Sequence, residues 1–262
     1  MNIYDFHRGS LPLLISIAHA GTFVPESIAQ RFSLAGSHLG DTDWHVDKLY
    51  AFARELGASI LSANYSRYVV DLNRAPDSSS LYASSPTSPV CPTLTFDGEA
   101  IYAAGLEPSA AELSARVAQY WQPYHQRLAG ELNELRERHG YALLWDAHSI
   151  ASEVPSLFNG VLPEFNFGTR DDASCPRAVA DQLLDLVTTD GKFGAVLNGR
   201  FKGGYITLHY GRPQHGVYAV QLELSRRVYM DEAAGTGWDP QRAESAAAII
   251  SQLLMRYLKA HA

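Results

Sequence analysis

Two apolar segments that each end in a histidine set the strongest constraint on how this chain can fold. Residues 13–18 lead directly to His19, and residues 142–145 lead through Asp146 to His148. Runs this short and this apolar are typical of strands buried on both faces of a parallel sheet. Ligands bind at the carboxyl ends of such strands. Because His19 and His148 would both lie at the carboxyl ends of such strands, we predict a metal ion bound between their imidazoles.

Strand-length apolar segments alternate with helix-length amphipathic segments along the chain. We expect strands over Leu13–Ala18, Ala58–Ala63, Tyr68–Leu72, Tyr141–Trp145, Ala195–Leu197 and Val217–Leu224, and helices over Asp43–Leu56, Ser109–His139, Pro176–Thr188 and Pro240–Lys259. Pro123 is a candidate break in the longest helix. The alternation predicts an α/β fold with a mainly parallel mixed β-sheet flanked by helices. We find no linker that divides the chain, and we expect one domain over residues 1–262.

Composition and charge argue against several classes of protein. The formal net charge is −7 and no block of Lys or Arg occurs, so a nucleic-acid surface is not expected. We see neither a signal peptide nor an apolar run of about 18 residues, which predicts a cytoplasmic protein without a membrane span. Cys91 and Cys175 are too few for a thiolate zinc cluster, and nothing demands that they pair. The sequence carries no signal for an oligomeric state.

The third metal ligand is sought among the acids, because a catalytic zinc usually takes three protein ligands and keeps one position open. Asp43 lies at a predicted helix start, and Asp47 follows one turn later on the same face. Asp146 can either bind the metal or orient His148 from behind. The alternative interpretation is that Asp43 caps the helix and that the histidines are structural. No HExxH motif is present, so the metal prediction rests on convergence of distant residues.

Arg67 and the pair Asn73-Arg74 bracket one predicted strand, and the pair would emerge at its carboxyl end. An arginine fork matches a carboxylate through two parallel hydrogen bonds. Two arginines and an amide facing one pocket therefore indicate a small acidic substrate. The alternative is that the arginines lie at the surface, paired with Asp71 or Asp77.

Glu223 lies inside an apolar strand, on the opposite face from its leucine and valine neighbours. An acid in this position is costly to bury unless it is paired. Arg226 and Arg227 are the candidate partners in the sequence. Close to a metal-activated water, Glu223 would instead serve as a general base.

Two loops remain open to interpretation. Residues 199–211 are rich in glycine but lack the spacing of a phosphate-binding loop. They form either a mobile binding loop, with Lys202, His209 or Tyr210 touching substrate, or a plain hairpin. Residues 75–92 are rich in serine and proline and lack periodicity. We favour a cover over the active site for them, the alternative being a floppy insertion.

Taken together, these residues resemble the N-formylglutamate deformylase (amidohydrolase) family. The resemblance rests on segments 19–25, 41–45, 66–74, 144–149, 198–207 and 221–224, with 229–232 behind them. It implies a fold similar to zinc carboxypeptidases and aspartoacylase-type deacylases. His19 and His148 match the two zinc histidines. Thr22 stands where an acidic ligand is expected, so we take Asp43 as the third ligand, with Asp47 and Asp146 as alternatives.

The resemblance also implies roles for the polar residues. Glu223 matches the base, Arg67 is placed near the oxyanion, and the substrate-binding side chains are expected to be Asn73, Arg74, Arg200, Lys202, Tyr205 and Arg212. The implied cofactor is one divalent metal, with Zn²⁺ favoured over Fe, Co or Mn. The implied reaction is hydrolysis of N-formyl-L-glutamate to formate and L-glutamate, the last step of a histidine degradation pathway.

Two other functions fit the same residues. Another N-acyl-amino-acid amidohydrolase on this scaffold would share every one of them. A non-catalytic protein that binds a small dicarboxylate would use the arginines and leave His19 and His148 as structural residues.

Overall fold

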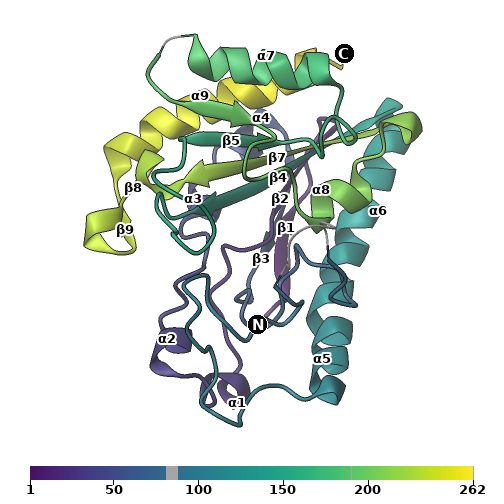
Figure 1. The fold of residues 1–262 in the computed structure, drawn as a ribbon. Coiled ribbons are helices and arrows are strands. Elements are labelled where there is room, and N and C mark those ends of the chain that lie inside the picture. Colours follow the sequence, from purple (N-terminus) through teal and green to yellow (C-terminus); the bar gives the residue numbers. More distant parts are fainter. Residues whose placement is uncertain (81–87, 190, 262) are drawn as a thin grey trace.

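The computed structural model describes residues 1–80, 88–189 and 191–261. Within them a seven-stranded sheet runs in the order β1 (Tyr4–His7), β3 (Ser59–Ala63), β2 (Leu13–Ile17), β4 (Ala142–Ile150), β7 (Val217–Ser225), β5 (Phe165–Gly168) and β6 (Ala195–Leu197) (Figure 1). Strands β3, β2, β4 and β7 are parallel neighbours, whereas β1 and β5 pair antiparallel with β3 and β7. The predicted mainly parallel mixed sheet is confirmed.

Helices cover both faces of this sheet. One face is covered by α3 (Val46–Leu49), α4 (Ala53–Leu56), α7 (Arg177–Thr188) and α9 (Pro240–Lys259), and the other by α6 (Gln122–His139) and α8 (Tyr205–Tyr210) (Figure 1). Trp145 and Leu222 are fully buried under the first group, and Leu144 and Tyr124 under the second. Burial of each such side chain contributes roughly 1.5–3 kcal/mol, which makes these two layers the core.

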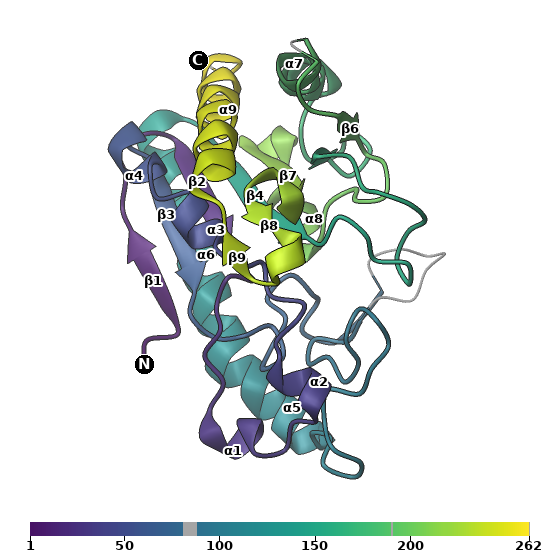
Figure 2. The ribbon, with the colours of Figure 1, turned by 90° about the vertical axis from the view of Figure 1, so that its left-hand side faces the viewer.

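Shorter elements complete the chain. They are α1 (Glu26–Ala29), α2 (Leu34–Ser37), α5 (Ala110–Arg116), a π-helical turn η1 (Val117–Trp121), 3₁₀ turns at Pro213–His215, Arg226–Val228 and Glu232–Ala234, and the hairpin strands β8 (Met230–Asp231) and β9 (Gly237–Trp238). The α1–α2 segment lies next to α5 in both views (Figures 1 and 2), where Arg31 is bonded to Glu112. In the described part of the chain, every helix is too short or too polar to cross a membrane.

The sheet register determines where two predicted site residues point. His148 of β4 is paired with Glu223 of the neighbouring strand β7. Paired residues on adjacent strands face the same side of a sheet, so both side chains emerge on one face. Strand β4 extends to Ile150, beyond the predicted end at Trp145, which places His148 within a regular strand.

The predicted long helix forms with one irregularity. Ser109 caps it by accepting a hydrogen bond from the backbone N–H of Glu112, and Gly140 ends it in a left-handed conformation. Pro123 does not end the helix. The turn immediately before it widens into the π-helical segment η1, because proline lacks an N–H and its ring crowds the carbonyl four residues earlier.

Two predicted elements are wrong. Residues 43–56 form two short helices, α3 and α4, in place of one helix. Residues 68–72 form turns and no strand, although Val69 and Val70 are buried. Their backbone groups bond within a turn, to a distant loop and to side chains in place of a strand ladder, as from the N–H of Val69 to the carbonyl of Ser66 and from the N–H of Asp71 to the carbonyl of Val90. The apolar run that suggested a strand is explained by packing into the core against α6.

Candidate active site

A cavity of about 430 Å³ opens at the carboxyl ends of β2, β4 and β7. Its polar wall comes from segments far apart in sequence: His19, Asp41, Asp43, Arg67, Asn73, Arg74, Ser88, His148, Ser149, Arg200, Gln221 and Glu223. Apolar side chains line the remainder, among them Pro89, Leu94, Phe96, Ile150, Leu157 and Phe201. A concave pocket with a few convergent polar groups is the usual form of a small-molecule site.

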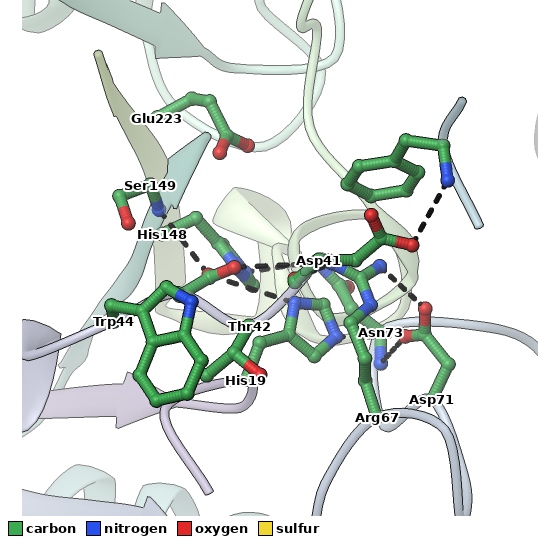
Figure 3. A network of polar contacts seen from close by, with 12 residues as sticks. His19, Asp41, Thr42, Trp44, Arg67, Asp71, Asn73, His148, Ser149 and Glu223 are labelled. Carbon is green, nitrogen blue, oxygen red and sulfur yellow. Dashed lines mark hydrogen bonds and ion pairs between the residues drawn. The ribbon is translucent and has the colours of Figure 1, made fainter. Parts of the chain in front are cut away.

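Three buried residues converge in this cavity as a candidate metal-ligand cluster: His19, Asp43 and His148. One possible ligand atom from each lies within 4.8 Å of the others. Oδ2 of Asp43 is 3.0 Å from Nδ1 of His148 and 3.7 Å from Nδ1 of His19. Figure 3 shows the imidazoles of His19 and His148 side by side. Two imidazole nitrogens and one carboxylate oxygen form a donor set that suits a divalent cation such as zinc.

Each histidine of the cluster is backed by its own buried aspartate. Nε2 of His19 lies 2.8 Å from Oδ1 of Asp71, and Nε2 of His148 lies 3.0 Å from Oδ1 of Asp146. Both acids are fully buried. At His19 this contact is a hydrogen bond, whereas at His148 it is an ion-pair contact without hydrogen-bond geometry; Nδ1 of each imidazole is directed at Asp43. Carboxylates placed behind metal-binding histidines commonly fix the ring in this way.

Asp43 is the acid that joins the histidines. It does not cap α3, which begins after His45 without a side-chain cap. Instead its Oδ2 accepts the backbone N–H of Ser149 at 3.2 Å. Burial raises the pKa of Asp43, but its hydrogen bonds with His148 and His19 outweigh burial and lower that pKa below its ordinary value. Asp47, the alternative acid, is exposed on α3 and does not line the cavity.

Arg67 is held inside the cavity wall. Its Nη2 donates to Oδ2 of Asp71 at 2.7 Å, and its Nη1 lies 3.8 Å from Oδ1 of Asp43. The pairing with Asp71 considered from sequence therefore occurs, but in the interior and not at the surface. Burial raises the pKa of Asp71, yet Arg67 and His19 outweigh burial and hold it well below its usual range. One carboxylate thus fixes both a metal-ligand candidate and a cation (Figure 3).

The amide of Asn73 is occupied by the protein. Its Oδ1 accepts the backbone N–H of Ile206 at 2.8 Å, while its Nδ2 lies 3.0 Å from Nε2 of His148 and 3.4 Å from Asp146. Gly204 packs so closely that an added Cβ would lie 2.4 Å from Nδ2 of Asn73. Asn73 therefore links α8 to His148 and Asp146.

Arg74 reaches the cavity from the main chain beside Asn73. Its Nε donates to Oγ of Ser88 at 3.0 Å, and its Nη1 donates to the carbonyl of Asn73 at 3.1 Å. Ser88, Pro89 and Pro92 also line the cavity. The predicted cover over the site falls partly on residues 81–87, which lie outside the described residues.

Glu223 faces the cavity across from the metal-ligand cluster (Figure 3). It is 8% exposed, and its carboxylate accepts a long hydrogen bond of 3.4 Å from Nε2 of Gln221. The arginine partners considered from sequence bond elsewhere: Arg226 donates to the carbonyl of Thr42, and Arg227 pairs with Glu164. Burial raises the pKa of Glu223 to about 8. A buried acid with a perturbed pKa in a cavity is a candidate for acid–base chemistry.

Residues 199–211 are neither a hairpin nor an irregular loop throughout, because α8 begins at Tyr205. Arg200 lines the cavity and donates to the carbonyl of Leu157 at 2.7 Å. Lys202 does not line it and pairs with Asp171 at the surface.

Tyr205 and Arg212 also lie outside the cavity lining. The ring of Tyr205 stacks on His209, with centroids 4.9 Å apart. Arg212 lies beyond the end of α8 and lines a separate hollow together with Arg136 of α6. The helix directs these side chains away from the metal-ligand cluster. Among the described residues, the structure therefore brings Asn73, Arg74 and Arg200 of the predicted substrate-binding set to the cavity, together with Arg67.

Sequence reasoning did not assign a site role to Ser149 or Gln221, which both line the cavity. Gln221 was detectable, since strand alternation puts it on the same face as Glu223. Its Oε1 accepts the backbone N–H of Gly204 at 2.7 Å, which fixes the orientation of the amide. Ser149 carries no comparable signal, because its contact with Tyr229 at 2.7 Å depends on the fold.

Comparisons with known proteins identify relatives that match nearly the whole of this chain. The family model for N-formylglutamate amidohydrolase matches residues 11–230. An N-formylglutamate deformylase from Pseudomonas aeruginosa is 49% identical over 252 residues, covering 96% of this chain and 94% of that protein. One from Pseudomonas putida is 46% identical over 256 residues, covering 98% and 96%. The crystal structure of an N-formylglutamate amidohydrolase from Ralstonia eutropha has a TM-score of 0.80 at 22% identity, covering 100% and 98%, and shows a shared fold.

Proposed function

The chain belongs to the N-formylglutamate amidohydrolase family, and we propose that it is a metal-dependent deformylase that converts N-formyl-L-glutamate to formate and L-glutamate. The observation that carries the proposal is the cluster of His19, Asp43 and His148 in one cavity with Glu223. Ligands, an acid–base group and carboxylate-binding arginines in one pocket are the parts that hydrolysis of an acidic amide requires.

The residues present fit a divalent cation, and we assign His19, Asp43 and His148 as its ligands. The fit rests on the two backing aspartates, because Asp71 and Asp146 leave Nδ1 of each imidazole directed at Asp43. Bound there, the cation supplies Lewis-acid activation of water and of the formyl carbonyl. Zinc is our first candidate, since two imidazoles and one carboxylate are typical of catalytic zinc sites.

Glu223 is the proposed general base. It takes a proton from the attacking water as the new C–O bond forms, and it returns that proton to the amide nitrogen as the C–N bond breaks. Its position beside His148 in the sheet register supports this role. Arg67, 3.8 Å from Asp43, stabilises the negative charge that develops on the formyl oxygen.

The two substrate carboxylates are assigned to the arginines that line the cavity. Arg74 enters from the segment after Asp71, and Arg200 enters from the segment before α8. Each guanidinium can bind a carboxylate with charge-assisted hydrogen bonds. The amide of Asn73 supports the site from behind, through His148 and Asp146.

The direct test is release of formate from N-formyl-L-glutamate by the purified protein, before and after treatment with a chelator and after addition of Zn²⁺. We expect release that is lost with the chelator and restored by the metal. N-acetyl-L-glutamate and N-formyl-L-aspartate, measured in parallel, separate the formyl and glutamyl preferences. Full activity in the chelated, metal-free protein would refute the metal assignment. No formate release from metal-loaded protein would refute the function.

A further inference from the structure

The segment that carries Asn73 and Arg74 is held from behind by the long helix. Nε1 of Trp121 donates to the carbonyl of Arg74 at 3.0 Å, and Nε2 of His125 lies 2.8 Å from the carbonyl of Leu72. The two contacts flank Asn73 along the main chain. Both side chains are nearly buried, with Trp121 9% and His125 4% exposed.

These contacts replace a strand ladder. Residues 68–74 make local turns, so the carbonyls at this end of the segment have no neighbouring strand to bond. A buried carbonyl needs a donor, and two side chains of the helix supply it here. Trp121 therefore fixes the main-chain position from which the Arg74 side chain departs.

The π-helical turn η1 positions the indole N–H of Trp121 that donates to the carbonyl of Arg74. Trp121 is the last residue of η1, and His125 lies one turn further along α6. Their rings stack with centroids 3.7 Å apart and an interplanar angle of 22°, which holds the indole in one orientation. Such π turns occur frequently at functional sites.

We propose that Trp121 is a positioning residue that sets the direction in which the Arg74 guanidinium enters the cavity, and thereby determines recognition of a substrate carboxylate. This inference rests on the proposed function of Arg74. The guanidinium lies close to its own main chain, with Nη1 bonded to the carbonyl of Asn73, so a shift of that main chain moves it directly.

The test is the variant Trp121→Phe, which keeps an aromatic ring against His125 and removes the indole N–H. We expect KM for N-formyl-L-glutamate to rise roughly three- to tenfold, the effect of one lost hydrogen bond. We expect kcat within about twofold of the parent enzyme and unchanged bound metal, measured by elemental analysis. A change in kcat or metal content without a change in KM would overturn the proposal.

A double-variant cycle shows whether the effect passes through Arg74. In an Arg74→Ala background, Trp121→Phe should produce no further rise in KM. An equal rise in both backgrounds would show a merely structural role and overturn the proposal. If Arg74→Ala alone leaves KM unchanged while the enzyme remains active, the carboxylate assignment fails separately, and this inference fails with it.

Trp145→Phe is the matched control. Its indole donates to Oη of Tyr50 at 2.8 Å, in the core on the other face of the sheet. This variant also loses one buried indole hydrogen bond, so it should lower the melting temperature and leave KM unchanged. An equal rise in KM for Trp145→Phe would show that a general loss of stability explains the Trp121 result.

Discussion

The two histidines and the carboxylate-binding segment of this cavity are held by different means. His148 lies within β4, and His19 follows β2 by two residues, so parallel ladders set their positions. Arg74 lies in a segment without a ladder, positioned by Trp121 of η1 and by Ser88. The sheet thus positions the two histidines, whereas individual side-chain contacts position the substrate-binding segment.

This difference teaches where substitutions should act. Substitutions next to His19 and His148 should alter metal binding or the chemical step, because the β-sheet hydrogen bonds that position these histidines do not depend on which substrate is bound. Changes behind residues 72–74 should alter KM, since each contact there is a separate hydrogen bond. The following predictions test that division.

The largest effect is expected for Glu223→Gln. The amide has nearly the same shape but cannot take a proton from water, so kcat should fall by about 10²- to 10⁴-fold. Bound metal, measured by elemental analysis, should stay at the level of the parent protein. Full turnover in this variant would remove Glu223 as the base.

Arg74→Ala tests the substrate wall. Loss of charge-assisted hydrogen bonds to a carboxylate should cost about 2–3 kcal/mol, seen mainly as a higher KM for N-formyl-L-glutamate. Arg136→Ala is the control, because this exposed arginine lines a separate hollow and should leave KM unchanged. An unaltered KM in the Arg74 variant would move the carboxylate site elsewhere.

Asp146→Asn tests the backing of His148. An amide in place of the carboxylate removes the negative charge 3.0 Å behind Nε2 of His148, so metal affinity should fall by about 10- to 100-fold. Competition with a chromogenic chelator measures that affinity without any assay of turnover. If the variant retains the parent affinity, the carboxylate behind His148 has no part in metal binding.

The last prediction concerns stability in acid and not activity. Burial lowers the pKa of His125 from 6.5 to about 3. Below pH 6.5 the imidazole of His125 is protonated in the unfolded chain, whereas in the folded chain it becomes protonated only near pH 3. The stability from this residue is therefore complete above pH 6.5 and is lost as pH falls, by at most about 1.4 kcal/mol per pH unit.

The variant His125→Gln isolates that contribution, since glutamine can donate to the carbonyl of Leu72 but does not titrate. Denaturant unfolding from pH 7 to pH 4 should show a shallower loss of stability in the variant than in the parent protein. Equal slopes in the two proteins would mean that protonation of His125 does not contribute to acid unfolding.

Much of the fold could be predicted from local patterns. The apolar runs before His19 and His148 are strands, and the closing helix has the predicted bounds Pro240–Lys259. The prediction failed at residues 68–72, where an equally apolar run is buried by packing on α6 and its backbone bonds to a turn, a distant loop and side chains. Burial and strand structure give the same signal in a short apolar run, so sequence could not separate them.

The candidate site was predictable where side chains extend from strands. His148 and Glu223 follow from alternation on β4 and β7. The roles of Asp71 and Trp121 could not be predicted from sequence, because each depends on a contact between segments far apart in the chain. The hydrogen bond from Trp121 to the carbonyl of Arg74 is an example. The spacing of Arg67 and Asp71, four residues apart, indicated a pair but not its burial.

The direct pairing of His148 with Glu223 on adjacent parallel strands has a consequence for how such enzymes diversify. Since hydrogen-bonded backbone sets the spacing between these two side chains, insertions and exchanges in the surrounding loops leave that spacing intact. Descendants of this scaffold can therefore acquire new acyl or amino-acid preferences through loop changes, while the spacing between His148 and Glu223 is inherited unaltered.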